Sequence, residues 1–193
     1  MPAPRLTYRP ATPDDEEQLA ALDTSFTTDT VHRVTAGPTG FTIRPEPVHP
    51  PLTKHFPADD DEDEDDDDAP KHTVVALDGD RVCGFVAVDH EPWNARLTIR
   101  DIAVAPTHRG HGIAGELMTR AYAYGRQRGA RHVWLEVTHL NAPAIRAYQR
   151  MGFTFCGLDT TLYTGTPSEG EIALFMSRSL PTAPDAPGPT SRP

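Results

Sequence analysis

The stretch Arg109-Gly110-His111-Gly112-Ile113-Ala114 decides how this chain is expected to fold. It follows an apolar strand candidate that ends at Val104, and it opens a helix expected over residues 112–128. A helix N-terminus exposes unpaired N–H groups and partial positive charge, and glycine lets the backbone approach an anion closely. Taken alone, the stretch fits a phosphate-binding turn and a turn that needs glycine only for its geometry equally well.

A second stretch begins 32 residues later, at Asn141, and continues through Ala142-Pro143-Ala144-Ile145-Arg146-Ala147-Tyr148 to Met151-Gly152-Phe153. Asn141 and Tyr148 stand seven residues apart, which is two turns along one face of a helix. Together, the two stretches favour an enzyme that holds a phosphorylated carrier and protonates a leaving group.

Charge is concentrated in one segment of this 193-residue chain. The formal net charge is −10, and residues 59–68 are ten consecutive acids, so the remainder is balanced. Such a block repels itself, and we expect a disordered insertion over about 57–70 within a single domain of residues 5–180. The Pro-rich tail 181–193 is also expected to be disordered. Because no basic patch is visible, a nucleic-acid partner is not expected.

The remaining composition indicates a cytosolic protein. Cys83 and Cys156 each lie in an apolar run, which predicts two small buried hydrophobes rather than a disulfide or a metal site. No segment approaches the roughly 20 apolar residues of a membrane span. The N-terminus has no signal-peptide core. Neither a membrane partner nor a metal is therefore expected.

Strand and helix patterns alternate in an order typical of an α/β layout around one mixed sheet. A capped helix is expected to start at Thr12-Pro13, and 25–30 and 45–57 are expected to be irregular connections. Strands are expected at residues 6–9, 31–35, 40–44, 72–77, 81–89, 97–104, 132–137, 153–157 and 171–176, and helices at 112–128 and 141–151.

The two motifs resemble those of the GNAT N-acetyltransferase superfamily: Arg109-x-x-Gly112-x-Ala114 and Asn141-x-x-Ala144-x-x-x-Tyr148-x-x-x-Gly152-Phe153. The resemblance implies a GNAT fold of α+β type, with a central mixed, mostly antiparallel β-sheet flanked by helices. It also implies acetyl-CoA as co-substrate. The residues expected to bind acetyl-CoA are Ile102, Ala103, Val104, Arg109, Gly110, His111, Gly112, Ile113, Ala114, Asn141 and Ala144.

Other segments resemble the streptothricin (nourseothricin) N-acetyltransferases: residues 25–31, residues 50–56 before the acidic run, Trp93-Asn94, and residues 157–159. This likeness implies acetylation of an amine on the β-lysine moiety of the antibiotic. Two alternatives stay open: an acetyltransferase for a protein N-terminus or another cationic metabolite, and a non-catalytic module that binds acetyl-CoA. The sequence also leaves open whether the protein is a monomer or a homodimer.

Acetyl transfer to an amine requires a base, because an alkylamine of pKa about 10.4 is neutral in only about one molecule in a thousand at pH 7. Glu136 is the first candidate, since a carboxylate within an apolar strand is unfavourable unless it is used or paired. The alternative is a structural ion pair or a position at the edge of the sheet. Asp101 is the second candidate, with substrate anchoring as its alternative. The family pattern carries further acids where this chain has Arg100 and Ala103.

Tyr148 is the expected proton donor to the leaving CoA sulfur, because a phenol is protonated at neutral pH; the alternative is a packing role. Asn141 anchors the carrier, caps its helix, or does both. Direct transfer through a tetrahedral intermediate is expected, because no base accompanies Cys156. A polycationic acceptor favours a pocket of carboxylates and aromatic rings. The candidates for this pocket, each of which fits an ordinary surface position equally well, are Asp23, Phe26, Asp29, Glu91, Trp93 and Tyr163.

Overall fold

The computed structural model describes residues 6–56 and 72–181, and the expected acidic insertion and the tail from residue 182 lie outside them. The elements in chain order are β1 (Leu6–Pro10), η1 (Pro13–Asp15), α1 (Glu16–Ala20), β2 (Phe26–Gly37), β3 (Gly40–Lys54), β4 (His72–Asp78), β5 (Arg81–Glu91), η2 (Pro92–Asn94), β6 (Arg96–Val104), η3 (Pro106–His108), α2 (Ile113–Gln127), β7 (His132–Thr138), α3 (Ala142–Arg150), β8 (Thr154–Asp159) and β9 (Ala173–Ser179).

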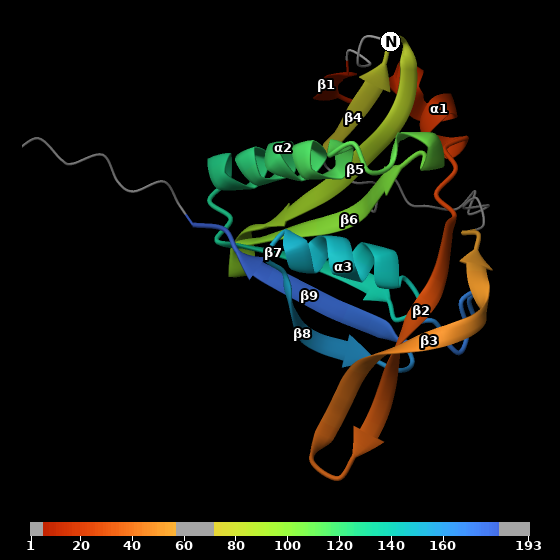
Figure 1. Cartoon of the computed structure of the whole chain (residues 1–193). Coiled ribbons are helices and arrows are strands. Elements are labelled where there is room, and N and C mark those ends of the chain that lie inside the picture. Colours follow the sequence, from red (N-terminus) through yellow and green to blue (C-terminus); the bar gives the residue numbers. More distant parts are fainter. Residues whose placement is uncertain (1–5, 57–71, 182–193) are drawn as a thin grey trace, which may run out of the picture.

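A seven-stranded sheet in the order β1-β4-β5-β6-β7-β9-β8 forms the centre of the molecule. Among the strands of the described residues only the β6–β7 pair is parallel, so the expected mixed, mostly antiparallel sheet is confirmed. Helices α2 and α3 lie on the same face of the sheet in Figure 1, and the main apolar core fills the space beneath them. The short helix α1 contacts β5, beside a smaller cluster of Val75, Leu77 and Val82.

The two parallel strands separate half-way along their length. Strand β6 pairs with β7 only from Arg96 to Ile99, where Ile99 lies opposite Leu135. Beyond that point β6 continues to Val104 against β5 alone, and β7 continues against β9. The register of β6 on β5 shifts between Ile99 and Asp101, which places a bulge at Arg100. Because a bulge bends its strand, it accounts for the opening between β6 and β7.

A long hairpin formed by β2 and β3 makes a sheet of its own, which corrects the expectation of one sheet and two irregular connections. Phe26 begins β2 and is buried, and residues 45–54 continue β3 despite their prolines. Proline has no N–H to donate, and it is tolerated here because β3 pairs with β2 alone and is therefore an edge strand. The hairpin extends away from the main sheet in Figure 1.

The two cysteines differ in environment, and the expectation that both are buried was wrong for one of them. Cys83 is buried in the main core, whereas Cys156 is exposed, and both are free thiols. Cys156 lies on β8, the last strand of the sheet, where the register on β9 shifts between Phe155 and Gly157. A bulge on an edge strand redirects side chains, so the apolar pattern alone did not predict the exposure.

Candidate active site

The opening between β6 and β7 carries the two candidate bases. Glu136 is the first residue of β7 after the last pair with β6, and Asp101 is the second residue of β6 after it. The backbone from Arg100 to Val104 therefore has one edge that β7 does not cover. The Asp101 carboxylate, which is exposed, accepts a hydrogen bond from the N–H of Ile102 at 2.6 Å.

The turn that follows β6 leaves the N-terminus of α2 accessible. Gly110 and Gly112 both have φ of +81°, a conformation that favours glycine, and a Cβ at either position would meet no atom within 4 Å. Gly112 is the N-cap of α2 and supplies no side chain to the first-turn N–H groups. Arg109 donates from Nε to the Val104 carbonyl at 2.8 Å, which ties the turn to the end of β6. An anion can therefore approach the helix N-terminus.

Helix α3 presents Tyr148 to the same opening. Asn141 caps this helix, because its Oδ1 accepts a hydrogen bond from the N–H of Ala144 at 3.1 Å. Tyr148 is buried, and among the described residues no group is hydrogen-bonded to its hydroxyl. Burial first, and then the negative charges of Asp101 and Glu136, raise the pKa of Tyr148. Asp101 and Glu136 therefore both lie within electrostatic reach of Tyr148.

Glu136 has a defined partner. The hydroxyl of Tyr163, in the loop between β8 and β9, donates a hydrogen bond to Glu136 Oε1. Burial raises the pKa of Glu136, the hydrogen bond from Tyr163 lowers it, the charge of Glu171 raises it and that of Lys54 lowers it; the net direction is upward. A carboxyl group with a raised pKa is suited to take up a proton near neutral pH.

Four residues that sequence reasoning missed surround this pair. Lys54, at the end of β3, forms an ion pair with Glu171, and its Nζ also lies 2.8 Å from Ser168 Oγ. Thr138 Oγ1 donates to the second carboxylate oxygen of Glu171. A weak indication existed in the sequence, because Lys54 and Lys71 are the only lysines among 18 basic residues. Lys54 was nevertheless not selected as a site residue, because residues 45–57 were expected to be an irregular connection.

The sequence profile of the Acetyltransferase (GNAT) family matches residues 42–153. This chain belongs to the GNAT acetyltransferase family. A streptothricin acetyltransferase of Streptomyces lavendulae is 54% identical over 180 residues, which cover 90% of this chain and 95% of that protein. The crystal structure of nourseothricin acetyltransferase has a TM-score of 0.84 at 55% identity and covers 91% of this chain and 99% of that chain. A Bacillus anthracis structure in complex with acetyl coenzyme A shares the fold, with a TM-score of 0.73 at 20% identity over 90% of this chain and 99% of that chain.

The chain is therefore an acetyl-CoA-dependent N-acetyltransferase, and its structure fits this co-substrate. The open space in front of Gly110 and Gly112 admits a pyrophosphate at the N-terminus of α2. The uncovered edge of β6 over Arg100–Val104 offers backbone groups to an extended, amide-containing chain. Among the described residues, no group of three metal-ligating side chains is found. None of the described helices is long and apolar enough to cross a membrane.

The predicted acceptor residues of the GNAT acetyltransferase do not all converge. Glu91 accepts hydrogen bonds from Arg96 at 2.8 and 2.6 Å and from Thr98 at 2.6 Å, at the start of β6. Trp93, in η2, is 82% exposed. Since the turn at Arg109 follows the far end of β6, Glu91 and Trp93 lie at the opposite end of that strand from it.

Four other acceptor candidates lie nearer to the opening or on the hairpin that flanks it. Tyr163 contacts Glu136 directly, and Phe26 pairs with Lys54 across the hairpin. Asp23 is exposed; hydrogen bonds from Ser25 and then the positive charges of Arg109 and His55 lower its pKa, which places it near the anion-binding turn. Asp29 is exposed on β2 and accepts a hydrogen bond from the Thr30 hydroxyl at 2.9 Å.

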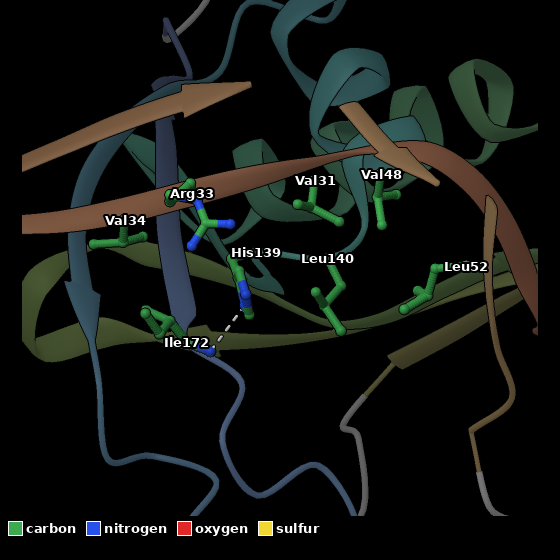
Figure 2. A pocket seen from close by; sticks show the side chains of 8 residues that line it. All are labelled: Val31, Arg33, Val34, Val48, Leu52, His139, Leu140 and Ile172. Atoms are coloured by element: carbon green, nitrogen blue, oxygen red, sulfur yellow. Dashed lines mark hydrogen bonds between the residues drawn. The ribbon is translucent and has the colours of Figure 1, made fainter. Parts of the chain in front are cut away.

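A cavity of about 280 Å³ lies between the hairpin and the β7–α3 turn (Figure 2). His139 Nδ1 accepts a hydrogen bond from the Ile172 N–H at 3.0 Å, and the His139 carbonyl accepts one from the His32 N–H at 2.8 Å. Burial lowers the pKa of His139. The lining residues are Val31, Arg33, Val34, Val48, Leu52, His139, Leu140 and Ile172. None of the candidate catalytic residues lines this cavity, so it is not the reaction centre. The residues around it instead join the hairpin to the β7–α3 turn, as the hydrogen bond between His32 and His139 does.

Proposed function

We propose that this acetyltransferase transfers the acetyl group of acetyl-CoA to an amine on the β-lysine moiety of streptothricin-class antibiotics and so confers resistance. The observation that carries the proposal is the convergence of Glu136, Asp101 and Tyr148 where β6 and β7 part. The 54% identity to a streptothricin acetyltransferase over nearly its whole length supports the choice of acceptor.

The chain's own groups are suited to hold acetyl-CoA, which supplies an activated acetyl thioester when bound. The first-turn N–H groups of α2 and the Arg109 side chain are assigned to the pyrophosphate. Backbone groups at Ile102–Val104 are assigned to the pantetheine amides. Asn141 accepts a hydrogen bond from the Ala144 N–H at the start of α3, and it is also assigned to anchoring the carrier.

Proton movement is assigned to two side chains. Glu136 Oε2 takes the proton from the acceptor ammonium, directly or through a water molecule, while Oε1 stays hydrogen-bonded to Tyr163. Burial and neighbouring negative charges raise the pKa of Tyr148, so its hydroxyl holds its proton at neutral pH. As the C–N bond forms and the C–S bond breaks, that proton is available to the leaving thiolate, and the second proton of the attacking nitrogen passes to solvent. Asp101, which is exposed, is assigned to anchoring the cationic acceptor.

Growth on the antibiotic tests the proposal. A streptothricin-sensitive bacterium that expresses the full chain is expected to grow at drug concentrations that stop growth of a strain expressing Tyr148→Phe at the same protein level. Recovery of a singly acetylated drug from the medium is the expected product. Growth that stays at the level of the Tyr148→Phe strain would contradict the antibiotic as acceptor.

A further inference from the structure

Lys54 connects two segments that are distant in the sequence. It is the last residue of β3, and its ammonium group contacts Ser168 and Glu171 of the loop that joins β8 to β9. The side chains of Lys54 and Glu171 are only 10% and 14% exposed. Thr138 of β7 donates to the other carboxylate oxygen of Glu171, so the ion pair is also held from the central sheet. A charge pair this sheltered is screened little by solvent.

The same loop carries the partner of the candidate base. Tyr163 stands in the β8–β9 loop, residues 160–172, and donates its hydroxyl proton to Glu136 Oε1. The loop is attached near its N-terminal end by Tyr163 to Glu136, and near its C-terminal end to Lys54 of the hairpin and to Thr138 and His139 of the β7–α3 segment. The Lys54 contacts at Ser168 and Glu171 are the ones that tie the loop to the hairpin, so their loss loosens the segment between Tyr163 and Glu171, because loops open locally where few buried contacts hold them.

We infer that Lys54 is a positioning residue for the general base: it fixes the β8–β9 loop so that Tyr163 stays on Glu136, and it neutralises Glu171 so that the acceptor ammonium is directed to Glu136. The inference rests on the proposed function, because it takes Glu136 as the base. It goes beyond that function by assigning the geometry and the ionisation of the base to a residue of the hairpin.

The charges around Glu136 support this assignment. Glu136 is faced by Tyr163 from the β8–β9 loop, by Glu171 from the end of that loop and by Lys54 from β3. The negative charge of Glu136 also raises the pKa of Tyr148 in α3. Burial raises the pKa of Glu136, Tyr163 lowers it, and then Glu171 raises it while Lys54 lowers it. Removal of the Lys54 charge therefore raises the pKa of Glu136, and removal of the Glu171 charge lowers it.

Four variants of the full chain separate this role from a purely structural one. Lys54→Met removes the charge, Lys54→Arg keeps it, and Glu171→Gln removes its partner. Arg33→Met is the matched control: it breaks an ion pair with Glu46 in the same hairpin, between side chains that are 63% and 43% exposed. For each protein, kcat and KM for the cationic acceptor are measured across pH, together with the Kd for acetyl-CoA and the Tm.

The acidic limb of the kcat/KM profile is the pH range in which activity falls as the general base becomes protonated. Lys54→Met and Glu171→Gln are expected to move this limb in opposite directions. Lys54→Met should lower kcat/KM at neutral pH by about tenfold or more, and most of this loss should be in kcat. Its acidic limb should move to higher pH. Glu171→Gln should move that limb to lower pH. Lys54→Arg should restore the wild-type limb, and Arg33→Met should stay within about twofold of wild type. The Kd for acetyl-CoA should stay within about twofold in all four.

An acidic limb that is the same in Lys54→Met, Arg33→Met and wild type would overturn the inference. If Lys54→Met does not fold, Lys54→Met/Glu171→Gln replaces it, because this pair of changes leaves no unpaired buried charge. Wild-type kcat/KM in that variant would equally overturn it. Glu136→Gln tests the base itself: full activity there removes Glu136 from the proposed mechanism, whereas an inactive Glu136→Gln with an unaffected Lys54→Met defeats only the positioning role.

Discussion

The hydroxyl of Tyr163 donates a hydrogen bond to Oε1 of Glu136, from the β8–β9 loop to the point where β6 and β7 part. This contact occupies one carboxylate oxygen, and the proton transfer proposed above uses the other. Tyr163 was expected to contact the acceptor, but here it donates to Glu136 and lowers the pKa of that carboxyl group. The position of a remote loop therefore influences the proton affinity of the candidate base.

Removal of the carboxylate at Glu136 should abolish most activity without loss of the co-substrate site. We expect Glu136→Gln to lower kcat about 10²- to 10⁴-fold, the range typical of a positioned general base. The rate of CoA thiol release at saturating substrate gives kcat, and titration calorimetry with acetyl-CoA measures binding of the co-substrate. An activity within a few-fold of wild type would transfer the base role to Asp101 or to solvent.

The pH dependence should respond to Tyr163. A base must be deprotonated, so kcat/KM falls as pH drops through the pKa of Glu136, which burial raises. The Tyr163 hydrogen bond lowers that pKa, so Tyr163→Phe should shift the acidic limb to higher pH. An acidic limb that is unchanged in Tyr163→Phe would show that Glu136 does not set the profile.

Tyr148→Phe removes a hydroxyl that is not hydrogen-bonded to any described residue. The ring remains to pack against Phe153, whose centroid lies 5.8 Å away, so the fold should be retained. We expect kcat to fall about 10²-fold with little change in KM, because the proton is delivered only as the thiolate leaves. A change confined to KM would indicate that Tyr148 binds rather than protonates.

The turn before α2 should be intolerant of a side chain. Gly112→Ala forces a Cβ into a φ of +81° and is expected to destabilise the protein by about 1 kcal/mol and to weaken acetyl-CoA binding. Gly115→Ala is the control for stability, because Gly115 lies within α2 with no positive φ, and it should stabilise by about 0.5–1 kcal/mol. Thermal unfolding and acetyl-CoA titration report the two effects; equal Tm changes in both variants would contradict the assignment.

Asp15 gives the fold a pH-dependent component. It is buried, accepts hydrogen bonds from Arg9 at 2.6 and 2.8 Å and from Thr12, and these hold the pKa of its carboxyl below the usual range. Because its pKa is lower in the folded state than in the unfolded state, the Asp15 carboxylate stabilises the fold above the unfolded-state pKa. This stabilisation is lost progressively as the pH falls below about 4. Asp15→Asn should cost about 2 kcal/mol at pH 7 and progressively less in acid, as measured by urea unfolding at several pH values. A cost that did not change with pH would reject this account.

The central sheet and the two motif helices could be predicted from the sequence because each has a strong local pattern. Apolar strand-like runs located β4–β7, and the spacing of Asn141 and Tyr148 located α3. The hairpin was predicted far too short, because proline at 45, 47, 50 and 51 indicates irregular chain unless the strand is known to lie at an edge. For the same reason Lys54 was not recognised.

The candidate site was predictable only where a residue's own stretch of sequence indicated its role. Glu136 and Tyr148 follow from their local surroundings, whereas the Tyr163–Glu136 contact joins residues 27 positions apart and the Lys54–Glu171 pair joins residues 117 positions apart. Long-range contacts of this kind depend on how the hairpin and the β8–β9 loop fold back on the sheet. Glu91 is the converse case: its charge predicted an acceptor contact, but Arg96 and Thr98 engage it elsewhere.

Incubation of the purified chain with acetyl-CoA and streptothricin tests the central claim most directly, with CoA release and product mass measured together. The account predicts one CoA released for each drug molecule that gains a single acetyl group, at a higher kcat/KM than for simple polyamines or peptide N-termini. CoA release with a polyamine or a peptide but none with streptothricin would contradict the proposed acceptor and retain the acetyltransferase chemistry.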